Sequence, residues 1–131
     1  MNTEGTMKEF YEVMEQVLVS HQLKDSISDM HRHIHDKRKP LDEVSSILLK
    51  KGFYPDNVEH DLFSYKFADG TTMFRHFFIR LAFLPAWIKI VPETRQEEIF
   101  NRIENVINEI SEEKGYFELT IPFVVISAIK L

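Results

Sequence analysis

The sequence has no cysteine and only four glycines among its 131 residues. Without cysteine the chain has no disulfides, no thiolate nucleophile and no sulfur-ligated metal site. The glycines, at positions 5, 52, 70 and 115, are far apart, so there is no glycine-rich loop of the kind that lets a backbone approach a nucleotide closely. The lack of cysteine suits a reducing compartment, and we expect the protein to be cytoplasmic.

Long apolar runs and an excess of positive charge are also missing. No wholly apolar stretch, residues 121–126 included, approaches the roughly 20 residues that cross a bilayer. No continuous apolar core follows the first lysine, so we expect no secretory signal. The formal net charge is −5, whereas phosphate binding needs a clustered cationic surface. We therefore expect neither a membrane nor nucleic acid as a partner.

The composition that is present is typical of one globular domain. Apolar residues make up 44% and charged residues 28% of the chain, and its length suffices for one hydrophobic core. We expect a single domain over residues 1–131, with residues 1–6 flexible. The predicted fold class is α+β, mostly helical with a small two-stranded antiparallel sheet. Dimerisation could extend this sheet, because two strands are too few to be self-sufficient.

Apolar residues three and four positions apart predict three helices in the first half of the chain. They cover about residues 7–20, 23–35 and 40–50. Pro40 suits the first turn of the third helix, because its fixed φ is compatible with helical backbone. The buried face of this helix is expected to consist of Leu41, Val44, Ile47 and Leu48.

The second half is predicted to contain an aromatic helix and a long amphipathic helix. The aromatic helix begins near Thr71 and ends or bends at Pro85. Its apolar stripe consists of Phe74, Phe77, Phe78 and Leu81. The long helix follows a capping-box pattern, Thr94 with Glu97, and ends at Lys114-Gly115.

Two segments alternate as strands do. The first has an aromatic face made of Phe63, Tyr65 and Phe67. It ends at Asp69-Gly70. The second spans residues 116–130 and becomes continuously apolar at Ile121, which predicts cover on both faces for part of its length. Pro122 favours a sheet edge or a bulge there.

Three segments together resemble a known family. They are KRKPLDEVSSILLKKGF (37–53), FSYKFADGTTMFRHFFIRLAFLPAWIKIVP (63–92) and EKGYFELTIPFVV (113–125). The sequence from about residue 10 to residue 130 is similar to the C-terminal part of bacterial and archaeal class I S-adenosylmethionine-dependent methyltransferases. The resemblance implies a helix ending in Gly-Phe, the sixth strand, an Asp-Gly-Thr turn, an aromatic helix, a bend containing tryptophan, a long helix and the seventh strand.

The cofactor-binding half of such enzymes has no counterpart in this sequence. There is no G-x-G motif, and no acidic residue follows a strand to hold a ribose. The resemblance therefore implies that this chain binds no cofactor alone, and S-adenosylmethionine only through a partner chain. We expect a noncatalytic substrate-covering or assembly module, acting as a homodimer or with a cofactor-binding partner, and not a complete methyltransferase. Positioning of the methyl acceptor would be its contribution.

Candidate substrate-binding residues lie in the aromatic segment and the turn before it. They are Asp69, Thr71, His76, Arg80 and Trp87. Asp69 could bind a substrate amine or hydroxyl, or cap the following helix. His76 could act as a general base, because imidazoles titrate near neutrality, or be a hydrogen-bonded core residue. The surrounding aromatic residues could line an apolar pocket or belong to the core.

Two clusters of basic residues have alternative interpretations. Lys37, Arg38 and Lys39 could bind an anion beside the start of the Pro40 helix, or form a solvated charged run. With an aromatic pocket they would make the alternative function, a free-standing module that binds a small ligand. His31 and His35 lie one helical turn apart and could share a metal ion. They could equally gather where the helix dipole favours positive charge.

Overall fold

The computed structural model describes all residues, 1–131. The helices are α1 (Lys8–Ser20), α2 (Lys24–Lys37), α3 (Leu41–Lys50), α4 (Gly70–Arg75), α5 (Phe77–Ala82), α6 (Leu84–Lys89), the 3-10 helix η1 (Glu93–Arg95) and α7 (Gln96–Lys114). The strands are β1 (Phe53–Phe67) and β2 (Phe117–Lys130). They form one two-stranded antiparallel sheet, so the predicted α+β class is confirmed.

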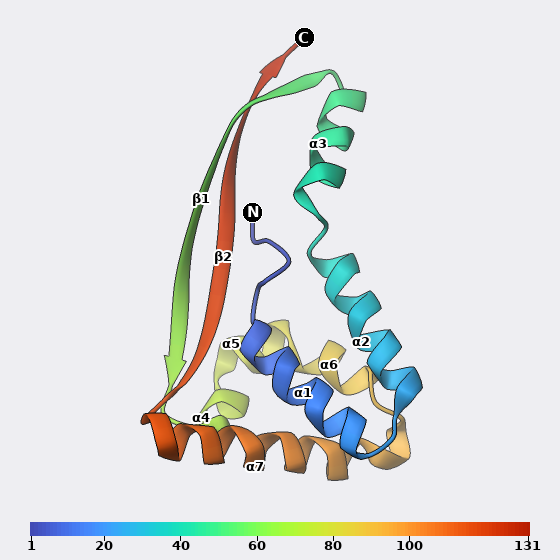
Figure 1. Cartoon of the computed structure of the whole chain (residues 1–131), viewed down its shortest axis with the longest axis vertical. Helices are drawn as coiled ribbons and strands as arrows, with labels where there is room; N and C mark the ends of the chain where they lie inside the picture. Colours follow the sequence, from blue (N-terminus) through green and yellow to red (C-terminus); the bar gives the residue numbers. More distant parts are fainter.

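A layer of helices forms the base of the molecule, and two arms rise from it (Figure 1). α7 lies along the bottom, with α1 and the short helices above it. One arm is the long sheet, and the other is α2 followed by α3. The arms meet at the far end, where the chain passes from α3 into β1 and Leu131 N–H donates to the Gly52 carbonyl at 2.8 Å.

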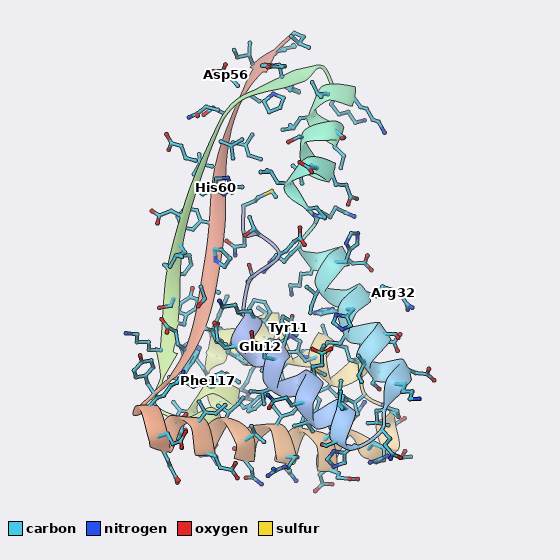
Figure 2. The ribbon with its side chains drawn as sticks, in the orientation of Figure 1. Tyr11, Glu12, Arg32, Asp56, His60 and Phe117 are labelled. Atoms are coloured by element: carbon cyan, nitrogen blue, oxygen red, sulfur yellow. The ribbon has the colours of Figure 1, made fainter.

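The sheet register runs from Phe53 opposite Lys130 to Phe67 opposite Phe117, with one irregularity between Pro55 and Asn57. Phe117 lies at the base, next to α7, whereas Asp56 lies near the far end of the arm (Figure 2). The two strands are therefore much longer than the base is deep. Only their lower part can pack against the helices of the base.

The hydrophobic core lies in the base, where α1 packs against α7 and the short helices. Phe10 and Trp87 are fully buried, and their rings stack with centroids 3.8 Å apart. α7 contributes a fully buried stripe at four-residue spacing, made of Ile99, Ile103 and Ile107. This buried stripe agrees with the prediction of a long amphipathic helix in this part of the chain.

The predicted aromatic helix is not continuous. α4 ends at Arg75, and His76 has extended backbone (φ −63°, ψ 132°) before α5 begins at Phe77. The Phe78 N–H donates to His76 Nδ1 at 3.2 Å, so the imidazole caps α5. Phe74, before the break, packs against the core, whereas Phe77 and Leu81 beyond it are 75% and 67% exposed. Prediction of a single buried helix was wrong because this local side-chain bond replaces one helical backbone bond.

The capping box predicted at Thr94 and Glu97 does not form. η1 precedes α7, and the residue that caps α7, Arg95, makes no side-chain hydrogen bond to the helix end. The predicted end of the helix is correct. Gly115 has a φ of 86°, in the left-handed region that favours glycine, and its N–H donates to the Ser111 carbonyl at 2.7 Å.

Both arms are less buried than the sequence predicted. No residue of α3 is buried, and Ile47 on its expected inner face is 45% exposed. β2 is covered as far as Val124, which is fully buried, but Val125 and Ile129 beyond it are 53% and 52% exposed. Cover on both faces is thus restricted to residues 121–124. The apolar end of the arm faces solvent.

Residues 1–6, which we expected to be flexible, lie along β2. Thr3 N–H donates to the Pro122 carbonyl at 2.9 Å, and Val124 N–H donates to the Met1 carbonyl at 2.8 Å. An antiparallel bridge joins Asn2 to Phe123. The N-terminal segment therefore occupies part of the edge of β2 that faces away from β1. The outer edge of β1 has no strand beside it.

Candidate functional site

Basic side chains of α2 meet the aromatic core at one corner of the base. We call Tyr11, His33, Lys37 and Arg38 the basic corner. The Lys37 Nζ atom lies 4.3 Å from the centre of the Phe83 ring, and the Tyr11 ring lies 6.3 Å from the His33 ring. The corner therefore joins α1, α2 and the residue that precedes α6.

Helix geometry explains this arrangement. His33 and Lys37 are four residues apart on α2 and so project from the same face. Arg38 follows as the residue that ends α2, with a non-helical φ of −132°. Arg32, on a different face of the helix, points away from the base, whereas Tyr11 lies between α1 and α2 (Figure 2). The C-terminal end of α2 thus places Lys37 and Arg38 beside Tyr11.

Two buried nitrogen atoms of the basic corner have no hydrogen-bond partner. They are His33 Nε2 and Arg38 Nε, and no other buried side-chain polar atom of the chain is unpartnered. Arg38 uses only Nη1, which donates to the Lys37 carbonyl at 3.2 Å. Neither Lys37 nor Arg38 is ion-paired with a carboxylate. The corner has unused hydrogen-bonding capacity and unbalanced positive charge.

The titration of the basic corner reflects this environment. Burial lowers the pKa of Lys37, and the Arg38 guanidinium lowers it further. Burial and then the charge of Lys37 lower the pKa of His33. Burial also raises the pKa of the Tyr11 hydroxyl, although an indole hydrogen bond and Arg38 oppose that shift. All three shifts disfavour the charged form of the side chain.

Trp87, a predicted substrate-binding residue, is completely buried in the core. Its Nε1–H donates to Tyr11 Oη at 3.0 Å. Trp87 therefore adjoins the basic corner through Tyr11 and has no surface of its own for a ligand. Sequence reasoning missed the contact between Tyr11 and His33, because it depends on the packing of α1 against α2.

Asp69 and Thr71 are engaged in the turn before α4. Asp69 Oδ1 accepts from the Thr72 N–H at 2.7 Å, and this bond lowers the pKa of the carboxyl. Asn108 of α7 accepts from the Gly70 N–H at 2.7 Å and donates to Thr71 Oγ1 at 3.2 Å. Asp69 is thus a helix cap. Asn108 was missed, although an amide at the edge of an apolar stripe was the available signal.

The other predicted substrate and anion residues are separated from the basic corner. His76 caps α5 and packs against Phe67 with ring centroids 5.4 Å apart. Arg80 is exposed on α5. Lys39 pairs with Glu43 at 3.3 Å. The structure therefore brings Lys37 and Arg38 together but not Lys39, and it does not gather the predicted substrate-binding residues into one pocket.

The two histidines predicted to share a metal ion face different carboxylates. His31 Nε2 lies 3.0 Å from Glu15 Oε1, and His35 Nε2 lies 3.7 Å from Glu43 Oε2. No group of three or more histidine, aspartate or glutamate side chains has the arrangement of a metal site. Metal binding at His31 and His35 stays a prediction, and no third side chain joins the two histidines as a ligand.

An aromatic strip extends from the sheet to α5. We define it as Phe63, Tyr65, Phe78 and Phe123. The ring centroids of successive members, Phe123 to Phe63 to Tyr65 to Phe78, are 5.9, 5.5 and 5.8 Å apart. Phe63 and Tyr65 are 44% and 40% exposed. The sequence correctly predicted an aromatic face on β1, but this face is open to solvent over most of its length.

A surface groove of about 290 Å³ lies elsewhere, along α7. Phe74, Leu84 and Ile88 form one side, and Phe100 and Glu104 of α7 form the other. None of the predicted substrate-binding residues lines this groove. Because His76 and Arg80 do not line it, this groove is not the aromatic pocket that the alternative small-ligand function would use.

Comparisons with protein-family models, curated proteins and solved structures found no match. They leave the methyltransferase resemblance as a proposal. None of the helices has both the length and the apolar character required to span a membrane.

Proposed function

We propose that this chain is a noncatalytic assembly or substrate-covering module related to the C-terminal part of class I S-adenosylmethionine-dependent methyltransferases. It works in association with a second copy or with a partner chain that carries the cofactor fold. The observation that carries this proposal is the uncovered state of β1. A partner seated on β1 would complete the sheet.

β1 lacks cover on both faces and on one edge. Only Phe67 is buried among its 15 residues. Leu62 is 63% exposed on one face, and Phe63 is 44% exposed on the other. A two-stranded sheet gains independent stability from further strands or from packing, and a long exposed apolar edge pairs readily with another chain. Association is therefore the function that this geometry supports best.

The order of elements supports the methyltransferase form of the proposal. The resemblance implies a helix, a strand, a turn, an aromatic segment, a long helix and a strand. α3, β1, the turn at Asp69-Gly70, α4 to α6, α7 and β2 follow in that order. A module of this kind would orient the methyl acceptor while the partner supplies S-adenosylmethionine. Arg80 and Phe77 on α5 are among the exposed side chains of the aromatic segment that could make that contact.

Two measurements on the isolated chain test the proposal. Light scattering over a dilution series should give a mass that rises from monomer toward dimer with concentration. Titration calorimetry with S-adenosylmethionine should give no binding heat. A constant monomeric mass would remove the homodimer form and leave the cofactor-bearing partner. Tight binding of S-adenosylmethionine by the monomer would overturn both forms.

A further inference from the structure

We infer that the basic corner is a binding site for a small oxyanion, a carboxylate or phosphate group, held by Lys37 and Arg38 beside Tyr11. The inference goes beyond the proposed association. Every residue of this site belongs to one copy of the chain, so oxyanion binding needs no partner.

A small cavity lies at this corner. Its volume is about 10 Å³, and its lining includes Tyr11, Lys37 and Arg38 together with the apolar side chains of Ile34 and Phe83. This volume is close to that of one water-sized probe. The cavity therefore admits a single oxygen atom of a larger group, whose remaining atoms would lie toward solvent.

The free donors of Arg38 match such a group. The Nε and Nη2 atoms of a guanidinium form a planar fork that binds two oxygens of a carboxylate or phosphate. In this structure Nη1 is occupied by the Lys37 carbonyl, whereas Nε is buried without a partner. A buried donor of this kind calls for a hydrogen-bond acceptor, which the oxygen of an anion supplies.

Lys37 supplies the second donor and a second charge. Its Nζ atom makes one long hydrogen bond, 3.4 Å, to the Ala82 carbonyl, and an ammonium group has three N–H donors. Phe83 holds the ammonium in place from one side, with 4.3 Å between Nζ and the ring centre. Lys37 can therefore donate to an oxygen in the cavity without leaving its present position.

The charge balance favours an anion over water. Among the lysines and arginines that are partly buried, Arg95 has an acidic partner, Glu98. Lys37 and Arg38 are adjacent, partly buried and without such a partner. Like charges in a partly desolvated site destabilise each other, and an anion relieves this repulsion whereas water does not.

Trp87 provides the signal for a binding experiment. It is the only tryptophan of the chain, and its Nε1–H bonds to Tyr11, which lines the cavity. We would titrate the full chain with sodium phosphate and, separately, with sodium acetate, at constant ionic strength kept with sodium chloride. At least one oxyanion should give a saturable change in tryptophan emission and a matching heat in titration calorimetry. The two titrations, with phosphate and with acetate, distinguish a phosphate site from a carboxylate site.

Matched variants assign the signal to the corner. Arg38→Gln should weaken oxyanion binding about tenfold or more, the expected effect of losing a charged hydrogen bond. Lys39→Gln removes the same charge one residue away, from a side chain paired with Glu43, and should bind like the native chain. Circular dichroism checks that each variant folds. If Arg38→Gln does not fold, Lys37→Gln takes its place with the same expected weakening.

The inference is overturned by any of three results. Neither oxyanion gives a saturable emission change or heat. Chloride in place of the oxyanion gives the same saturation. The Arg38 and Lys37 variants bind as tightly as Lys39→Gln. None of these results depends on whether the chain dimerises, so they leave the proposed association to its own test.

Discussion

Phe10 and Trp87 lie nearly parallel at the centre of the core, with an angle of 16° between their rings. Trp87 also contacts Phe83 at a centroid distance of 5.6 Å and donates its indole N–H to Tyr11. A fully buried aromatic side chain contributes about 2 to 3 kcal/mol to stability. At the residue scale, this cluster ties α1 to α6 and also sets one wall of the basic corner.

Truncation of Phe10 should therefore destabilise the fold strongly. Phe10→Ala leaves a cavity against Trp87 and is expected to lower the free energy of unfolding by about 3 to 5 kcal/mol. Phe77→Ala is the matched control, because Phe77 is 75% exposed and its loss should change stability by about 0.5 kcal/mol at most. Urea denaturation followed by tryptophan emission and circular dichroism measures both. Equal losses in the two variants would contradict the placement of Phe10.

The lowered pKa of His33 predicts a pH dependence of stability. Because the folded state binds the His33 proton less tightly than the unfolded chain, its contribution to stability is fully present above the unfolded value of about 6.5 and is lost as pH falls through the folded value. The facing groups are Tyr11 of α1 with Asp36, Lys37 and Arg38 of α2.

A comparison of the native chain with the variants His33→Gln and His60→Gln isolates the contribution of His33 to the pH dependence of stability. Between about pH 7.5 and about pH 5, the native chain should lose more unfolding free energy than His33→Gln does. The control His60→Gln, an exposed position midway along the sheet (Figure 2), should follow the native curve. Denaturation midpoints at each pH provide the data. A His33→Gln curve with the native slope would refute the assignment.

At the scale of elements, the periodic segments were predictable and the locally determined ones were not. α1, α2, α3 and α7 were each predicted within a few residues, because their apolar spacing or helix-end signals are clear. The break between α4 and α5 was not, since it depends on one side-chain bond from His76 to the backbone two residues on. The pattern that predicts a helix contains no information on that competition.

The candidate site shows the same division. The run at residues 37–39 was visible in the sequence as an anion-binding candidate. Lys37 and Arg38 lie beside Tyr11, whereas Lys39 pairs with Glu43. This arrangement depends on where α2 ends and on how α2 packs against α1. Asp69 was correctly seen as a possible cap, because helix caps are local. Contacts between distant segments were not readable from spacing.

Gly70 tests the packing of one element on another. A Cβ atom at this position would lie 2.9 Å from the Glu104 carbonyl oxygen and 3.0 Å from the Ile107 side chain, so α4 can approach α7 only because residue 70 has no side chain. Gly70→Ala should cost about 1 to 3 kcal/mol through overpacking. Gly5→Ala, whose added atom would lie 3.4 Å from Pro122 Cγ, is the control, with a change of about 0.5 kcal/mol or less. Urea denaturation midpoints of the two variants measure the difference in stability. Equal midpoints for Gly70→Ala and Gly5→Ala would contradict the close contact between α4 and α7.

At the scale of the whole molecule, the base and the arms differ in character. The base holds the buried aromatic cluster and the stripe of α7, whereas the far half of the sheet arm has exposed apolar side chains on both strands. Exposed polar residues such as Asp56, Glu59 and His60 lie on the same arm. Tyr54, Leu62 and Ile129, all more than half exposed, nevertheless favour an arm that is covered in an assembly.

The association of two copies should depend on the aromatic strip. Phe63→Lys places a charge where a partner would exclude water, and a buried unpaired charge is strongly unfavourable. We expect the dimer dissociation constant to rise about tenfold or more, equivalent to about 1.4 kcal/mol or more. Val19→Lys is the matched control, because Val19 is also exposed, at 58%, but lies at the end of α1 away from the sheet. Sedimentation velocity over a dilution series gives both constants. If Val19→Lys weakens association as much as Phe63→Lys, or if neither changes it, the sheet is not the surface through which this molecule assembles.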